Sequence, residues 1–151
     1  MKIIDILPKD AIICDASVGS KKQLLETLAC LASQQTGLDE RFVLDALIER
    51  ERLGTTGIGH GVALPHTRLS TLNKIFCSFV RTTPVDFDSV DDKPVDLVFL
   101  LLVPEEAGAD HLKALARLSR LLRDETIAAD LRHAKDATAV YTLIQNNDKE
   151  D

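Results

Sequence analysis

The sequence predicts an α/β fold: a single layered domain in which a mixed β-sheet is flanked by helices on both faces. Segments with the composition of strands alternate along the chain with segments whose apolar residues recur at helical spacing. The run Val95 to Val103 is almost continuously apolar, which is typical of a central strand buried on both faces. The length of 151 residues suits one domain, so residues 1–151 are expected to form one unit.

The first half of the chain is expected to supply one short strand and two helices. Ala11 to Cys14 has the composition of a strand. Ser20 opens a capping-box pattern, which predicts a helix that starts there and stops at Gly37. A second helix is expected after its cap at Asp39, with an apolar stripe at helical spacing, and it ends at Gly54.

The second half is expected to contain two strands and three helices. Ile75 to Val80 is expected to be the strand before the central one, and the aspartate-rich stretch between the two is expected to form turns or an edge hairpin. Leucines at helical spacing predict a long helix capped by Asp110. A short helix is expected near Ile127 to Leu131, and a last one from Asp136 to Ile144. The polar tail Asn146 to Asp151 is expected to fray.

Charge and hydropathy narrow the classes of function. The net charge is −6, and the chain has no cluster of Lys and Arg of the kind that nucleic-acid binding requires. No apolar run is long enough to span a bilayer, and the N-terminus has no signal-peptide pattern, so a cytoplasmic protein without membrane insertion is expected. Positively charged partners are favoured, because opposite net charges speed encounter.

No metal site and no cofactor are expected. Cys14, Cys30 and Cys77 are isolated from one another, so they suggest neither a zinc site nor a disulfide framework, and we expect small buried apolar residues. His60 and His66 are six residues apart, but a third ligand is not evident. The glycine pattern matches neither the dinucleotide-binding motif nor the phosphate-binding loop of nucleotide triphosphatases.

His66 has the strongest sequence context of the four histidines. Three glycines spaced by two precede it, and they allow the backbone to approach a ligand closely. Pro65 fixes the backbone immediately before the imidazole. The groups expected to bind phosphate oxygens are Thr55, Thr56, Gly59 and Thr67. From the residues alone, a tight turn with an incidental histidine stays open as the alternative.

The other candidate residues have simpler explanations when the residues alone are considered. Arg50 is explained as a cation at a helix C-terminus, where the helix dipole favours positive charge. His111 is explained as an exposed residue of a first helical turn, and His133 as a solvated cation at a helix end.

The segment that ends at His66 contains Ile58-Gly59 and then Val62-Ala63-Leu64-Pro65-His66. This segment resembles the phosphohistidine signature of the mannitol/fructose-type IIA family of the bacterial phosphotransferase system, and the nitrogen-regulatory members above all. The resemblance covers nearly the whole chain; its other segments are Ser20-Lys21-Lys22, Arg50-Glu51-Arg52, Gly54-Thr55-Thr56-Gly57, Lys93-Pro94-Val95-Asp96-Leu97 and Val103-Pro104. Thr67 departs from the small residue, often glycine, that the family has there, and its branched side chain narrows access to His66.

The resemblance implies roles for three residues. His66 matches the phosphorylated histidine, His111 the neighbouring active-site histidine, and Arg50 the active-site arginine, with Arg52 as the second candidate. A neutral imidazole is a good nucleophile near pH 7, and phosphoryl transfer needs placement and charge neutralisation. Since α/β sheets place ligand sites at strand ends, we expect both imidazoles to face one shallow depression.

The resemblance also implies partners. The donor is expected to be a small histidine-phosphorylated carrier protein, and the phosphorylation state is expected to regulate target proteins of nitrogen or other metabolism. Two alternatives stay open: a sugar-route IIA subunit that passes the phosphoryl group to a IIB domain, and a binding regulator without phosphoryl chemistry.

Overall fold

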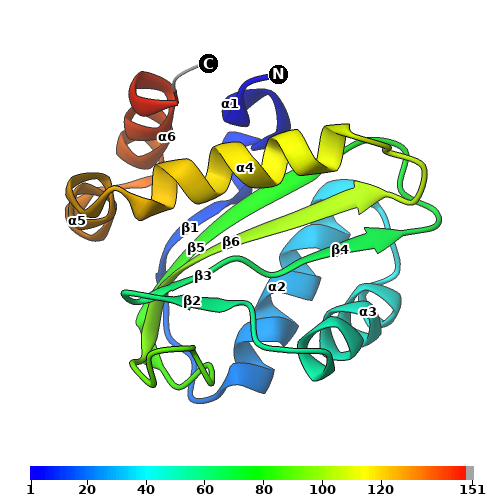
Figure 1. Cartoon of the computed structure of the whole chain (residues 1–151), viewed down its shortest axis with the longest axis horizontal. Helices are drawn as coiled ribbons and strands as arrows, with labels where there is room; N and C mark the ends of the chain where they lie inside the picture. The colour runs from blue at the N-terminus through cyan, green and yellow to red at the C-terminus, as the bar shows by residue number, and fades with distance from the viewer. Residues whose placement is uncertain (149–151) are drawn as a thin grey trace.

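The computed structural model describes residues 1–148, and it forms one layered α/β arrangement (Figure 1). The strands are β1 (Ile12–Ala16), β2 (Gly57–Gly59), β3 (Val62–Ala63), β4 (His66–Leu69), β5 (Phe76–Val85) and β6 (Val95–Pro104). The helices are α1 (Ile3–Ile6), α2 (Lys21–Thr36), α3 (Glu40–Arg52), α4 (Asp110–Arg123), α5 (Glu125–His133) and α6 (Ala137–Asn147), and a 3-10 turn lies at Lys9–Ala11. None of the helices within residues 1–148 is long and apolar enough to cross a bilayer.

The strands form one mixed sheet around β6. β5 pairs with β6 in the antiparallel sense, and β1 runs parallel to β5 at one edge. On the other side, β3 and then β4 run parallel to successive parts of β6, and β2 pairs with β3 in the antiparallel sense. Helices α2 and α3 cover one face, and α4 crosses the other face beside α1, α5 and α6 (Figure 1). The residues from Leu97 to Val103 are buried, which confirms the predicted central strand and fold class.

The predicted capping residues start and end the first helices. The Ser20 hydroxyl accepts a hydrogen bond from a backbone N–H of the first turn of α2, and the Asp39 carboxylate does the same for α3. Gly37 ends α2 in the left-handed conformation, with φ of 79°. Asp136 caps α6 in the same way as Asp39 caps α3. These local signals predicted correctly where α2, α3 and α6 begin and where α2 ends, whereas α3 ends at Arg52 before the predicted Gly54 and α6 continues to Asn147 beyond the predicted Ile144.

The predicted cap at Asp110 is wrong. The cap position of α4 is Ala109, which is itself in a helical conformation and makes no side-chain capping bond. The N–H of Asp110 donates to the carbonyl of Ala107, so the chain is already turning before the helix begins. Asp110 is already helical, so its carboxylate lies in the first turn of α4, where the helix dipole favours a negative charge.

Strand β5 is longer than the sequence predicts. The expected strand stops at Val80 because Arg81 interrupts the apolar run, but β5 continues to Val85. The Arg81 guanidinium donates to the carbonyls of Cys14, at 2.9 Å, and of Leu131, at 2.8 Å. These carbonyls satisfy a charged group inside the sheet, so the strand does not end there.

Other boundaries also shift. The first strand ends at Ala16 rather than Cys14. Helix α5 is longer than the predicted range, Ile127 to Leu131, by about half a turn at each end. The aspartate-rich stretch between β5 and β6 forms turns, as expected. Among the cysteines, Cys77 is buried as expected, and burial raises the pKa of its thiol, whereas Cys14 and Cys30 are half-buried.

The predicted frayed tail begins too early in the chain. Asn146 and Asn147 belong to α6, and the Asp148 side chain is only 4% exposed. Its carboxylate accepts the Ile3 N–H at 2.6 Å and forms an ion pair of 2.8 Å with Arg117 on α4. Asp148 thereby joins α1, α4 and the end of α6. Residues 149–151, the rest of the predicted tail, lie outside the described residues.

Asp148→Ala should destabilise the fold by about 1.5–3 kcal/mol, because it leaves the largely buried Arg117 guanidinium without its ion-pair partner and the Ile3 N–H without its acceptor. Urea unfolding followed by circular dichroism measures the change. Asp130→Ala, which removes an exposed carboxylate from α5, is the matched control and should leave the midpoint nearly unchanged. Equal midpoints for the two variants would show that the contacts of Asp148 with Ile3 and Arg117 add no stability.

Candidate functional site

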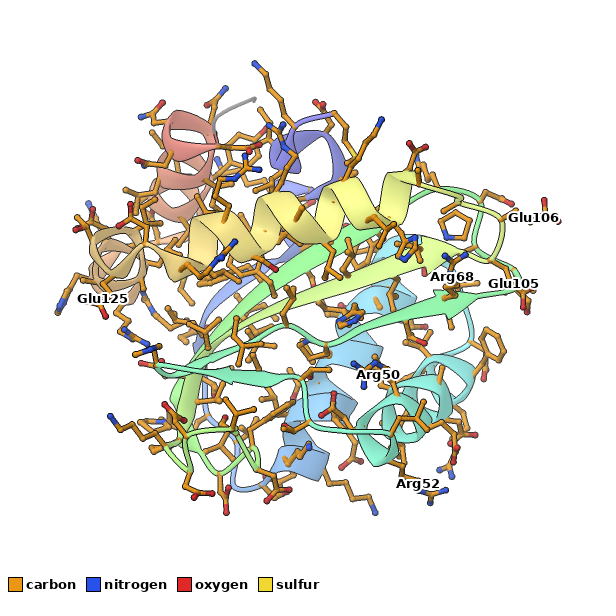
Figure 2. All side chains as sticks on the ribbon, in the orientation of Figure 1. Arg50, Arg52, Arg68, Glu105, Glu106 and Glu125 are labelled. Carbon is orange, nitrogen blue, oxygen red and sulfur yellow. The ribbon has the colours of Figure 1, made fainter. Side chains whose placement is uncertain are left out.

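One depression of about 300 Å³ at the edge of the sheet contains the three residues that the family resemblance implies for the active site. Its lining residues are Arg50, His66, Thr67, Arg68, Leu101, Val103, His111 and Leu115. They come from α3, β4, β6 and α4, so the depression forms where the sheet edge meets helices from both layers. Figure 2 shows Arg50 on α3 and Arg68 on β4, next to the loop that follows β6.

His66 is the first residue of β4, and the sequence predicts neither that strand nor β2. The chain makes a short hairpin from β2 and β3 and then leaves β6 at Leu64, whose N–H donates to the Thr56 carbonyl. At Pro65 it returns to β6, since the Pro65 carbonyl accepts the Leu101 N–H at 2.9 Å. The break between β3 and β4 thus lies immediately before the half-buried His66.

The hydrogen bond of the His66 ring determines which nitrogen is available. Nδ1 lies 2.8 Å from the Leu64 carbonyl oxygen. A carbonyl oxygen can only accept, so Nδ1 holds the proton and Nε2 holds the lone pair of the neutral ring. Nε2 is therefore the nucleophilic atom of this imidazole.

Arg50 lies in the last turn of α3 and is half-buried. Its Nη1 donates to the carbonyl of Gly54 at 3.0 Å, and this bond holds the side chain at the rim of the depression. The bond uses one of the five N–H donors of the guanidinium, which leaves donors for an anion. Arg52, the second candidate, pairs with Glu49, is exposed and does not line the depression; Figure 2 shows it on the side of α3 away from Arg50.

His111 lies in the first turn of α4, as expected, and its ring contacts two other groups of the loop and sheet. Nδ1 is 2.9 Å from the Gly108 carbonyl oxygen, which assigns the proton to Nδ1. Arg68 Nη2 lies 3.0 Å from Nδ1 and 3.4 Å from Nε2, so in this tautomer the guanidinium can donate only to Nε2. In this arrangement His111 Nε2 accepts from Arg68.

Arg68 is the site residue that the sequence analysis missed. It follows His66 by two positions on β4, and side chains two apart on a strand lie on the same face. Its Nη1 donates to the Glu105 carbonyl at 2.8 Å, which fixes the guanidinium beside the loop before α4. The period of two could have identified Arg68, but only if β4 itself had been predicted.

The charge of the depression differs from that of the chain. The whole chain has a net charge of −6. The depression contains two arginines and two histidines, and within residues 1–148 no Asp or Glu lines it. Guanidinium groups stay protonated at all physiological pH values, so the depression is locally positive and suits an anion.

Of the four groups expected to bind phosphate, only Thr67 lines the depression. The Thr55 hydroxyl donates to the Phe87 carbonyl at 3.0 Å and accepts from a neighbouring backbone N–H. The Thr56 hydroxyl donates to the Glu51 carboxylate. Gly59 lies in β2 against Asp91. The structure therefore brings Thr67 to His66 but gives the other three groups structural partners elsewhere.

The remaining histidines lie away from the depression. His60 occupies the turn between β2 and β3 with φ of 58°, and its N–H donates to Asp91. Its carbonyl accepts from Arg132, at 2.7 Å. His133 is the exposed last residue of α5. Within residues 1–148 there is no cluster of His, Cys, Asp and Glu suited to a metal ion.

Comparisons with known proteins identify the family of the chain. Residues 5–147 match the family model of the phosphoenolpyruvate-dependent sugar phosphotransferase system, EIIA 2. The chain is 54% identical over 145 residues to the nitrogen regulatory protein of Bradyrhizobium diazoefficiens, covering 95% of each chain. It is 37% identical to the fructose-specific EIIA component of Haloferax volcanii, covering 94% of each chain.

A solved structure extends the comparison to the fold. The nitrogen regulatory protein IIA-Ntr of Neisseria meningitidis superposes with a TM-score of 0.90 and 40% identity, covering 94% of this chain and 98% of that one. The resemblance found in the sequence is thereby confirmed over almost the full length. The chain belongs to the EIIA type 2 family of the phosphoenolpyruvate-dependent sugar phosphotransferase system, and most resembles its nitrogen-regulatory members.

Proposed function

We propose that this chain is a cytoplasmic phosphoryl carrier, one domain over residues 1–151, that works through a phosphohistidine at His66. EIIA components receive phosphate from phosphocarrier proteins and pass it to partners. The donor that we propose is a small histidine-phosphorylated carrier protein. The supporting observation is the lone-pair nitrogen of His66 beside two guanidinium groups in a depression that, within the described chain, has no carboxylate.

The transfer step follows from the hydrogen bond at Nδ1. The Nε2 lone pair forms a bond to phosphorus while the P–N bond on the donor breaks, and that electron pair returns to the donor imidazole. The Nδ1 proton stays on the His66 ring, where the Leu64 carbonyl, 2.8 Å away, stabilises the positive charge that develops. The step consumes no cofactor.

The two arginines supply the charge that the step requires. Phosphoryl transfer depends on positioning and on neutralising charge over the equatorial oxygens. We propose that Arg50 and Arg68 bind those oxygens from opposite sides of the depression. His111 orients Arg68, because its Nε2 accepts from Arg68 Nη2 at 3.4 Å. A doubly protonated His111 would also donate to a phosphate oxygen.

The proposed role is regulatory: the phosphorylation state of His66 controls the binding of target proteins of nitrogen or other metabolism. The relative with 54% identity is named a nitrogen regulatory protein, whereas the fructose-specific EIIA component of Haloferax volcanii is 37% identical. This second relative favours one alternative function, a sugar-route subunit that passes the phosphoryl group to a IIB domain.

A transfer assay with isotopically labelled carrier distinguishes these functions. We expect label to move from the phosphorylated carrier to this protein in an acid-labile, base-stable form. We also expect no onward transfer to fructose- or mannitol-type IIB domains, and phosphorylation-dependent capture of other partners. Rapid onward transfer to a IIB domain would support the sugar-route alternative. Absence of any labelling would reject the carrier function and leave a binding regulator.

A further inference from the structure

We propose that Glu51 is a positioning residue that holds His66 and Arg50 in the geometry for transfer, an inference that rests on the proposed function. Glu51 does not line the depression. It lies one residue after Arg50 near the end of α3, and its side chain is only 6% exposed. A carboxylate is rarely buried to this extent without specific partners, and Glu51 has three.

The partners of Glu51 come from two other segments. Oε1 accepts the Thr56 N–H at 3.0 Å, and Oε2 accepts the Thr56 hydroxyl. The ammonium of Lys21, at the start of α2, lies 3.0 Å from Oε1 and 4.5 Å from the Phe87 ring centroid. Lys21 neutralises the carboxylate, so Glu51 does not reduce the positive potential at the depression.

A chain of hydrogen bonds leads from Glu51 to the reacting imidazole. Glu51 fixes both donors of Thr56, whose side chain is buried. The Thr56 carbonyl accepts the Leu64 N–H at 3.0 Å, and the Leu64 carbonyl accepts the His66 Nδ1–H at 2.8 Å. Each bond orients the next group, so the position of Thr56 determines the acceptor that selects the His66 tautomer.

The contact between Glu51 and Thr56 also fixes the Arg50 side chain. The chain between α3 and Thr56 folds back on the helix, and the Gly54 N–H donates to the Glu51 carbonyl at 3.2 Å. The Gly54 carbonyl accepts from Arg50 Nη1 at 3.0 Å. Holding Thr56 against Glu51 therefore also fixes the carbonyl that orients the Arg50 guanidinium. One buried carboxylate positions both the nucleophile and a phosphate-binding cation.

Glu51→Gln tests this proposal, because it keeps the shape of the side chain and removes the charge that Lys21 pairs with. We expect a population of the other His66 tautomer, with the proton on Nε2, to appear in imidazole 15N NMR spectra. We also expect phosphoryl transfer to slow by about tenfold or more, since displacements of about 1 Å can cost as much as 10²-fold. A loss of stability alone would change neither the tautomer of the folded protein nor its rate.

Two further variants keep the test decisive. Glu49→Gln removes an exposed carboxylate two residues earlier on the same helix and should leave tautomer and rate as in the wild type. Thr56→Val removes the hydroxyl bond to Glu51 at constant shape and should reproduce the shift if Glu51→Gln fails to fold. Wild-type tautomer and rate in folded Glu51→Gln or Thr56→Val would overturn the proposal. If wild-type protein accepts no phosphate, the proposed function fails, whereas the tautomer still reports on Glu51.

Discussion

His66→Ala should abolish acid-labile, base-stable labelling by the phosphorylated carrier while the protein remains folded. The variant removes the imidazole of the depression whose Nδ1 donates to the Leu64 carbonyl, which leaves Nε2 as the nucleophilic nitrogen. The side chain is half-buried and, within residues 1–148, makes one hydrogen bond, to the Leu64 carbonyl, so little stability depends on it. Filter-bound label measures the loss, and thermal unfolding checks the fold.

His133→Ala is the matched control for this experiment, since His133 is exposed at the end of α5, and it should accept label like the wild type. Full labelling of His66→Ala would eliminate the proposed acceptor. Label mapped to His60 would place the reaction at the hairpin turn between β2 and β3 instead.

Arg50→Ala should slow phosphoryl transfer to His66 by on the order of 10²-fold, equivalent to about 2–4 kcal/mol of transition-state stabilisation. The variant removes one of two fixed positive charges in the depression and leaves Arg68. The fold should persist, because the Arg50 side chain makes one hydrogen bond to the rest of the described structure, to the Gly54 carbonyl. Single-turnover quench-flow measurements with labelled carrier give the rate directly.

Arg52→Ala is the control that distinguishes the loss of a phosphate-binding group from the loss of a positive charge at the end of α3. Arg52 is also in the last turn of α3, but it is exposed, pairs with Glu49 and lies outside the depression. Its loss should change the rate by less than about threefold, as for an exposed surface charge. A similarly small change in Arg50→Ala would reject the phosphate-binding role and support a simple helix-end cation.

The parts of the fold that were predictable depend on short-range signals. Ser20, Gly37, Asp39 and Asp136 act within one turn of their own helices, so sequence spacing was enough to identify them. The central strand β6 was predictable because its long apolar run requires burial on both faces. The resemblance to a known family added Arg50 and His111, which the residues alone did not distinguish from ordinary surface cations.

The parts that were missed depend on pairing between distant segments. β2 and β4 have three and four residues, too few for a periodic pattern, and they exist because β3 and β6 provide partners. Without β4, Arg68 could not be placed on the same face as His66. Thr56 was similarly misread, since its hydroxyl faces the Glu51 carboxylate, a contact that spacing along the chain does not reveal.

Within the described residues, no acidic residue lines the depression, and this affects how the protein binds and then releases its phosphoryl donor. The chain has 24 acidic and 18 basic residues, yet the depression holds two fixed positive charges. A phosphoryl group brings about −1.5 to −2 charges near pH 7, which cancels them. The unphosphorylated protein would attract a phosphorylated donor, whereas the phosphorylated protein would lose that attraction and release the dephosphorylated donor. Association with the donor should therefore depend on ionic strength much more for the unphosphorylated protein than for the phosphorylated protein.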